Sequence, residues 1–85
     1  MNCFIAISQA PEVLDAVPAK FPDHHFEIQH GVWAVAATNK TAGDICDALG
    51  INRDGKHAGV VINASAYNGY FSNNLWEKLQ LWEEL

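Results

Sequence analysis

The side chains of this chain that could hold a metal ion are scattered along it. His24, His25 and His30 offer nitrogen ligands, and Cys3 or Cys46 could add a sulfur. None of these residues has the spacing typical of a zinc site. In a strand, adjacent His24 and His25 would also point to opposite faces and could not converge on one ion. We therefore expect no metal site.

Nucleophilic catalysis has equally little support. Ser8, Ser65 and Ser72 lack the glycine-rich strand-to-helix turn that exposes a catalytic serine. Cys46 lies on the apolar side of an expected helix, where cysteine usually serves as a small core residue. We predict no catalytic residue and no cofactor. An enzyme that uses His or Cys in a pocket stays open as a third alternative.

Two groups of residues could bind a small ligand. The turn "RDGKH" brings Arg53, Lys56 and His57 around a glycine, where cations and backbone donors could hold a carboxylate or phosphate. A plain β-turn is the simpler interpretation. The second group is aromatic, in a pocket expected between a sheet and the last helix. Its members would be Tyr67, Tyr70, Trp33 and Trp76.

Nucleic acid is not an expected partner. The chain has 5 Lys and Arg against 10 Asp and Glu, a net charge of −5, and no basic stripe. The stretch "TAGDICDALGI" resembles the first half of a helix-turn-helix motif. The next residues form an Asp54-Gly55 turn and a β-branched run, which cannot supply a recognition helix.

The pattern along the chain predicts the order β-α-β-β-α-β-α. Strands are expected at 2–7 ("NCFIAI") and 58–64 ("AGVVINA"), with a hairpin between them at 25–38. One helix should start at Pro11 and be short or kinked at Pro18. A second should run from a Thr41–Asp44 capping box to Gly50. The last helix is expected from Asn74 onwards.

The hairpin "HFEIQHGVWAVAAT" alternates in both arms. A two-residue turn at His30-Gly31 would place Gln29 opposite Val32, and Ile28 opposite Trp33. One face would then carry Phe26, Ile28, Trp33, Val35 and Ala37. The other would carry Glu27, Gln29, Val32, Ala34 and Ala36.

These elements predict one α+β domain over residues 1–85. Its fold would be a ferredoxin-like β-α-β-β-α-β antiparallel sheet with an additional C-terminal helix. Two crossover helices would cover one sheet face. A different strand order, or exchange of the last helix between subunits, are the alternatives.

The expected function is that of a small protein-interaction module, binding a second copy of itself as a homodimer or another protein. The sheet face without crossover helices is unusually apolar, and the last helix has an apolar arc wider than one stripe needs. Either a second subunit or the chain's own last helix should cover that face. The expected interface residues are Val32, Ala34, Ala36, Trp76, Leu81 and Leu85. A small-molecule-binding protein is the alternative.

The compartment is expected to be cytoplasmic. No apolar run reaches membrane-spanning length, so no membrane partner is expected. The N-terminus "MNCFIAISQAPE" lacks the basic region of a secretory signal. Two cysteines without such a signal are expected to be buried thiols rather than a disulfide.

Overall fold

The computed structural model describes residues 1–52, 57–65 and 81–82. The predicted β-α-β-β-α-β order is confirmed within them. The elements are β1 (Asn2–Ile7), α1 (Pro11–Lys20), β2 (His25–Gln29), β3 (Val32–Ala37), α2 (Ala42–Leu49) and β4 (Val60–Asn63).

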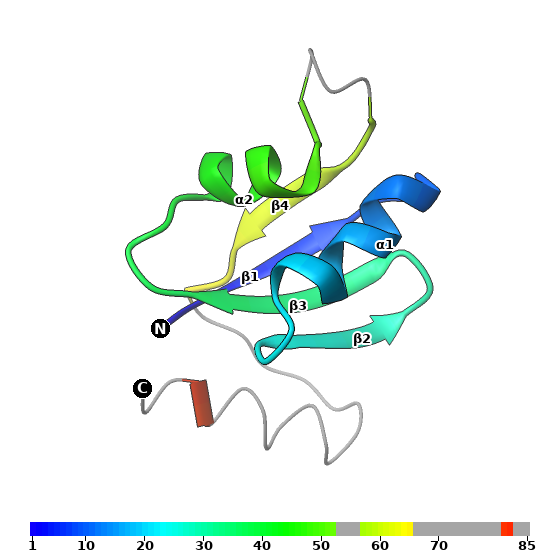
Figure 1. Ribbon diagram of the computed structural model, residues 1–85. Coiled ribbons are helices and arrows are strands. Elements are labelled where there is room, and N and C mark those ends of the chain that lie inside the picture. The colour runs from blue at the N-terminus through cyan, green and yellow to red at the C-terminus, as the bar shows by residue number, and fades with distance from the viewer. Residues whose placement is uncertain (53–56, 66–80, 83–85) are drawn as a thin grey trace.

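The strands form a single four-stranded sheet in the order β2-β3-β1-β4. Each neighbouring pair is antiparallel, as predicted. Strands β1 and β3 are central, while β2 and β4 are the two edges. Helices α1 and α2 cover the same face of this sheet (Figure 1). The opposite face is called here the second face.

The main core lies between the helices and the sheet. Its buried members come from both helices, two central strands and the turn after α2. They are Phe4, Ala6, Val13, Val17, Val35, Ile45, Leu49 and Ile51, with Val61 of β4 packed against them. Burying these aliphatic and aromatic groups is the main favourable contribution to the stability of the fold.

Both helices begin where the sequence predicts. Helix α1 has Pro11 in its first turn, and α2 has the expected capping box, with Gly50 in the left-handed conformation at its end. Pro18 does not end α1, which continues to Lys20. The Phe21 N–H donates to the Val17 carbonyl at 2.9 Å, so the last turn closes beyond the proline.

The hairpin register differs from the prediction beyond its first pair. Gln29 lies opposite Val32 as expected, but Glu27 then faces Trp33 and Phe26 faces Ala34. A β-bulge between Glu27 and Gln29 leaves Ile28 as an extra residue. The predicted face is therefore wrong for the strand before the turn. Phe26 and Ile28 belong to the second face, while Trp33, Val35 and Ala37 stay together under the helices.

The expected last helix lies outside the described residues except for Leu81 and Trp82. These two neighbours have opposite environments: Trp82 is buried and Leu81 is 55% exposed. Trp82 packs with Ala34 and Ala36 on the second face. A side chain of the same chain therefore covers part of the face for which either a helix of its own or a second subunit was expected.

Candidate functional site

The second face is apolar across β3, β1 and β4. Ile5 of β1 lies opposite Ala34 of β3 and Ile62 of β4, and Ile7 lies opposite Val32 and Val60. Residues that lie directly opposite each other in a sheet project on the same side. Two rows of aliphatic side chains therefore cross these three strands on this face.

Trp82 covers one part of this surface. It is 2% exposed and forms a buried cluster with Ala34 and Ala36. Partly buried hydrophobic side chains surround the cluster. They are Met1, Cys3, Ile5, Phe26 and Ile28. Two alanines below an indole leave room for the ring to lie close to the strands, which explains the small side chains in the middle of β3.

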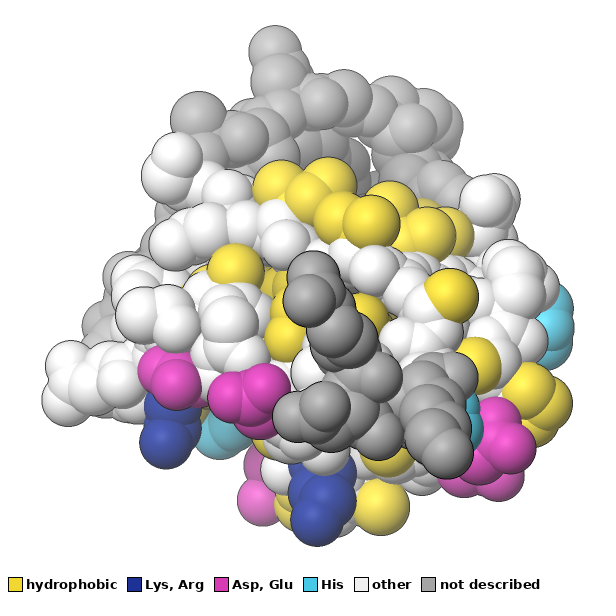
Figure 2. Space-filling view, turned by 90° about the horizontal axis from the view of Figure 1, so that it is seen from above, with side chains coloured by type: hydrophobic (Ala, Val, Ile, Leu, Met, Phe, Trp, Pro, Cys, Tyr) yellow, Lys and Arg dark blue, Asp and Glu magenta, His cyan; other side chains and the backbone are white. Residues whose placement is uncertain are grey.

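The other part of the second face is open. Ile7 is 39% exposed, Val60 is 54% exposed and Ile62 is 49% exposed. The strand register places these three side chains beside one another, and they are called here the open patch. In Figure 2, seen from the α2 and β4 end of the molecule, hydrophobic side chains gather in a band at the surface. Contiguous exposed apolar surface on a small protein usually marks a contact site.

The open patch adjoins a sheet edge without charges, proline or a bulge. From Ala58 to Ser65 the chain "AGVVINAS" has no charged side chain and no proline. The other edge, β2, carries an exposed Glu27 and the bulge at Ile28. Charges and bulges are devices that prevent an edge strand from pairing with another chain. Of the two edges, β4 is the one suited to pairing.

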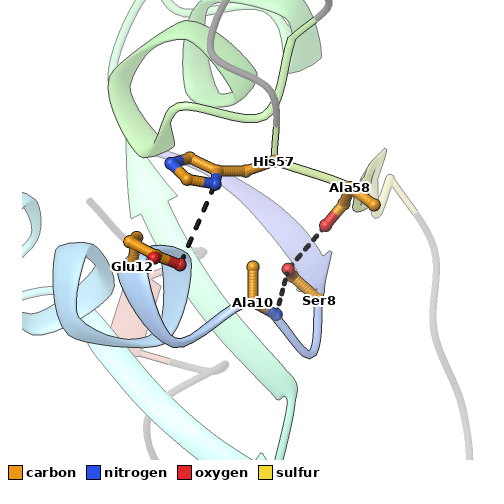
Figure 3. Close-up of polar contacts among 5 residues, drawn as sticks. All are labelled: Ser8, Ala10, Glu12, His57 and Ala58. Carbon is orange, nitrogen blue, oxygen red and sulfur yellow. Dashed lines mark hydrogen bonds and ion pairs between the residues drawn. The ribbon is translucent and has the colours of Figure 1, made fainter.

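The approach to β4 is fixed by a buried serine. Ser8, at the end of β1, is 6% exposed. Its hydroxyl donates to the Ala58 carbonyl at 2.6 Å and accepts from the Ala10 N–H at 3.1 Å (Figure 3). Gly59 is the next residue, and a Cβ there would lie 2.8 Å from the Ile7 carbonyl oxygen. These contacts hold the start of β4 against the end of β1.

His57, from the predicted anion-binding turn, lies at the same corner. Its Nδ1 is 3.9 Å from Glu12 Oε2 at the start of α1 (Figure 3). Its ring also comes near Gly50, where a Cβ would be 3.2 Å from Cδ2. A carboxylate beside the imidazole disfavours an anion at this point. Arg53 and Lys56, the other two predicted residues, lie outside the described residues.

The predicted interface residues fall into three groups. Ala34 and Ala36 are buried beneath Trp82, and Val32 is half-buried at the start of β3. Leu81 is exposed. Trp76 and Leu85 lie outside the described residues. The structure therefore brings together two of the predicted residues under a side chain of their own chain.

Of the predicted aromatic pocket, the structure describes Trp33 alone. Trp33 packs on the side of the helices, whereas Trp82 lies on the second face. The indole Nε1 of Trp33 is buried with no hydrogen-bond partner among the described residues. Its ring contacts His25 at 5.6 Å between centroids. Tyr67, Tyr70 and Trp76 lie outside the described residues, so the pocket stays a prediction. A pocket on the second face would not include Trp33, because that side chain packs on the helix side of the sheet.

His25 and Cys46 both contact other parts of the fold. His25 Nδ1 is 2.5 Å from the Phe21 carbonyl oxygen, which holds the chain before β2. Cys3 and Cys46 are both thiols, not joined in a disulfide. Burial raises the pKa of the Cys46 thiol, and Asp47 adds to this, while the Val61 backbone N–H opposes it. No group of three metal-ligating side chains occurs in the part of the chain that the structure describes.

The sequence-based prediction names the second face as an interaction surface but omits the residues of the open patch, although a signal for them is present. The run "AGVVINA" predicts a buried strand because β-branched residues fill it. In the predicted topology, however, the last strand lies at an edge. In an edge strand, every second side chain can remain exposed to solvent, as the side chains of Val60 and Ile62 do here.

Comparison of the chain with models of known families, with curated proteins and with solved structures found no match. Among the helices of the described residues, none has the length and apolar character needed to cross a bilayer. The case for a function therefore rests on the geometry of the second face and the β4 edge.

Proposed function

We propose that this protein is a small cytosolic interaction module that associates with a second copy of itself. The module would be a ferredoxin-like domain with an additional C-terminal helix, and the contact would be the open patch. The single observation that carries the proposal is the exposure of Ile7, Val60 and Ile62 as one contiguous group. Leaving three large aliphatic groups in water is unfavourable, and their burial would favour association.

The distribution of charge favours a second copy of the chain as the partner at the open patch. The chain has a net charge of −5, so two copies repel each other over most of their surfaces. The segment from Ala58 to Ser65 is uncharged and brings no like charges together. An acidic protein can therefore meet its own copy here without the electrostatic penalty that most other surfaces would carry.

The state of the cysteines fits the cytosolic part of the proposal. Cys3 and Cys46 do not form a disulfide with each other, and Cys46 is half-buried in the packing of α2 against the sheet. Cysteines that stay as thiols are typical of a reducing compartment.

Sedimentation equilibrium at micromolar concentration tests the proposal. We expect a dimer for the wild-type chain and a monomer for a Val60→Thr, Ile62→Thr double variant, because threonine keeps the strand preference and removes apolar area. Glu27→Ala, on the opposite edge, is the control and should stay dimeric. Circular dichroism would show that all three chains are folded.

A wild-type chain that stays monomeric at high concentration would overturn the proposal. So would a double variant that is folded and still dimeric, because the contact would then lie elsewhere. Leu81→Thr separates the predicted surface around the chain's last helix from the open patch. Dissociation by Leu81→Thr with a dimeric double variant would move the interface to Leu81.

A further inference from the structure

The backbone of β4 has one set of hydrogen-bonding groups directed away from the sheet. The Ala64 N–H donates to the Cys3 carbonyl at 2.9 Å, so Ala64 faces β1 with its polar groups. Along an antiparallel strand these groups alternate in direction from residue to residue. Val60 and Ile62 therefore also bond towards β1, whereas Val61 and Asn63 direct their N–H and C=O groups outward.

Val61 has a weak contact on its outward side. Its N–H lies close enough to the Cys46 thiol to influence that group's ionisation. Sulfur is a weak hydrogen-bond acceptor compared with a carbonyl oxygen. If the Val61 N–H donated to a carbonyl oxygen of another strand instead of the Cys46 sulfur, the hydrogen bond would be stronger.

We propose that two copies pair β4 with β4 in antiparallel orientation about a twofold axis at Val61, joining their two sheets into one. This inference rests on the proposed self-association and specifies its geometry. Val61 of each copy would exchange N–H···O=C bonds with Val61 of the other. Such a contact uses the same patch on both subunits, as a twofold interface requires.

The axis position follows from the faces of the strand. In an antiparallel pair, opposite residues share a face, so only registers that match Val60 and Ile62 with residues on the second face are allowed. An axis at Val61 places Val60 of each copy opposite Ile62 of the other. Both exposed side chains then find an aliphatic neighbour.

The two nearest alternative registers are less favourable. An axis at Val60 would pair Val60 with itself and leave Ile62 opposite the small Ala58. An axis at Ile62 would pair Ile62 with itself and leave Val60 opposite the small Ala64. On the helix side it would place the polar Asn63 opposite Val61, which packs on the main core. The axis at Val61 matches large aliphatic groups with each other on the second face, so we prefer it.

Disulfide trapping distinguishes these arrangements. With an axis at Val61, Val60 and Ile62 form non-hydrogen-bonded pairs, whose Cα atoms lie about 4.5 Å apart. That distance suits a disulfide. In a background of Cys3→Ala and Cys46→Ala, one protein would carry Val60→Cys and the other Ile62→Cys. The two would be mixed in equal amounts and oxidised, and also oxidised separately.

We expect a covalent dimer from the mixture and little from either protein alone. A dimer from Ile62→Cys alone would overturn the Val61 axis in favour of the Ile62 axis, and a dimer from Val60→Cys alone would overturn it in favour of a Val60 axis. Sedimentation of the reduced proteins provides the second measurement. If they are dimeric but no combination cross-links, β4 pairing is wrong while self-association stands. If they are folded and monomeric, as is the wild type, both proposals fail.

Discussion

At the scale of single residues, Asp44 is held in the capping box at the start of α2. Its Oδ2 accepts from the Thr41 N–H at 2.8 Å, and its own N–H donates to Thr41 Oγ1 at 3.1 Å. The Thr41 backbone bond is the main reason that the pKa of Asp44 lies below its ordinary value, with Thr41's side chain and Lys40 adding to it. The capping box thus favours the ionised carboxylate.

This environment predicts an acid-dependent loss of stability. Because the pKa of Asp44 is lowered on folding, the unfolded chain binds more protons in acid. The contribution is present above about pH 4, the ordinary aspartate range, and is lost as the pH falls through the folded-state pKa. Urea unfolding between about pH 5 and 2 should show a shallower decline for Asp44→Asn than for the wild type. Equal slopes would contradict the role of the cap.

Other single residues have the packing roles typical of a small core. Cys46 is a half-buried thiol whose pKa is raised by burial, which makes it a poor nucleophile near neutral pH. His25 contacts the Phe21 carbonyl and so holds the backbone before β2. These placements explain why the sequence offers several reactive residue types without a catalytic arrangement in the described part of the chain.

At the scale of elements, the hairpin turn depends on Gly31. Its φ is +84°, and a Cβ there would lie 2.8 Å from the Ser8 carbonyl oxygen. We expect Gly31→Ala to lower the free energy of unfolding by more than about 1 kcal/mol, since strain and a clash both act. The matched control is Gly43→Ala in α2, where the nearest atom would be Thr41 Oγ1 at an ordinary 3.6 Å.

The control should raise stability by up to about 1 kcal/mol, because alanine is the better helix residue. Chemical denaturation of both variants gives the comparison. A tolerated Gly31→Ala would mean that the turn connecting β2 and β3 can adopt another conformation.

The hairpin also shows where prediction from the sequence ends. The existence of both strands, the turn and the Gln29–Val32 pair follow from alternation and glycine chemistry. The bulge at Ile28 does not, because one extra residue leaves the sequence pattern intact while reversing the side of everything before it. The predicted face of Phe26 is wrong for this reason. The capping box of α2 can be predicted in full because all its contacts are local.

At the scale of the whole molecule, Trp82 connects the end of the chain to the sheet. It is 2% exposed and clusters with Ala34 and Ala36, which are far from it in sequence. The sequence indicates that a helix or a second subunit should lie on this face. It does not choose between them, because the choice depends on how the chain returns after β4.

The burial of Trp82 predicts that its truncation lowers the free energy of unfolding far more than truncation of its neighbour Leu81. Trp82→Ala should lower the free energy of unfolding by about 3–5 kcal/mol, as for other buried aromatic residues. Leu81→Ala, at a 55% exposed position, should change it by less than about 0.5 kcal/mol. Urea titration of both variants is the measurement. Similar small effects would show that the cluster on the second face contributes little to folding.

The order of the strands in the sheet has a consequence for how the protein is made. Strand β1 is the first strand of the sheet to be synthesised, yet its two neighbours are β3 and β4. Its pairing with β4 joins residues such as Phe4 and Asn63, which are separated by most of the sheet's sequence. Contacts of this kind require large loops to close and slow folding. On the ribosome, the edge of β1 that pairs with β4 therefore stays unpaired until β4 has been translated. This exposed apolar edge is where a chaperone would have the longest time to bind.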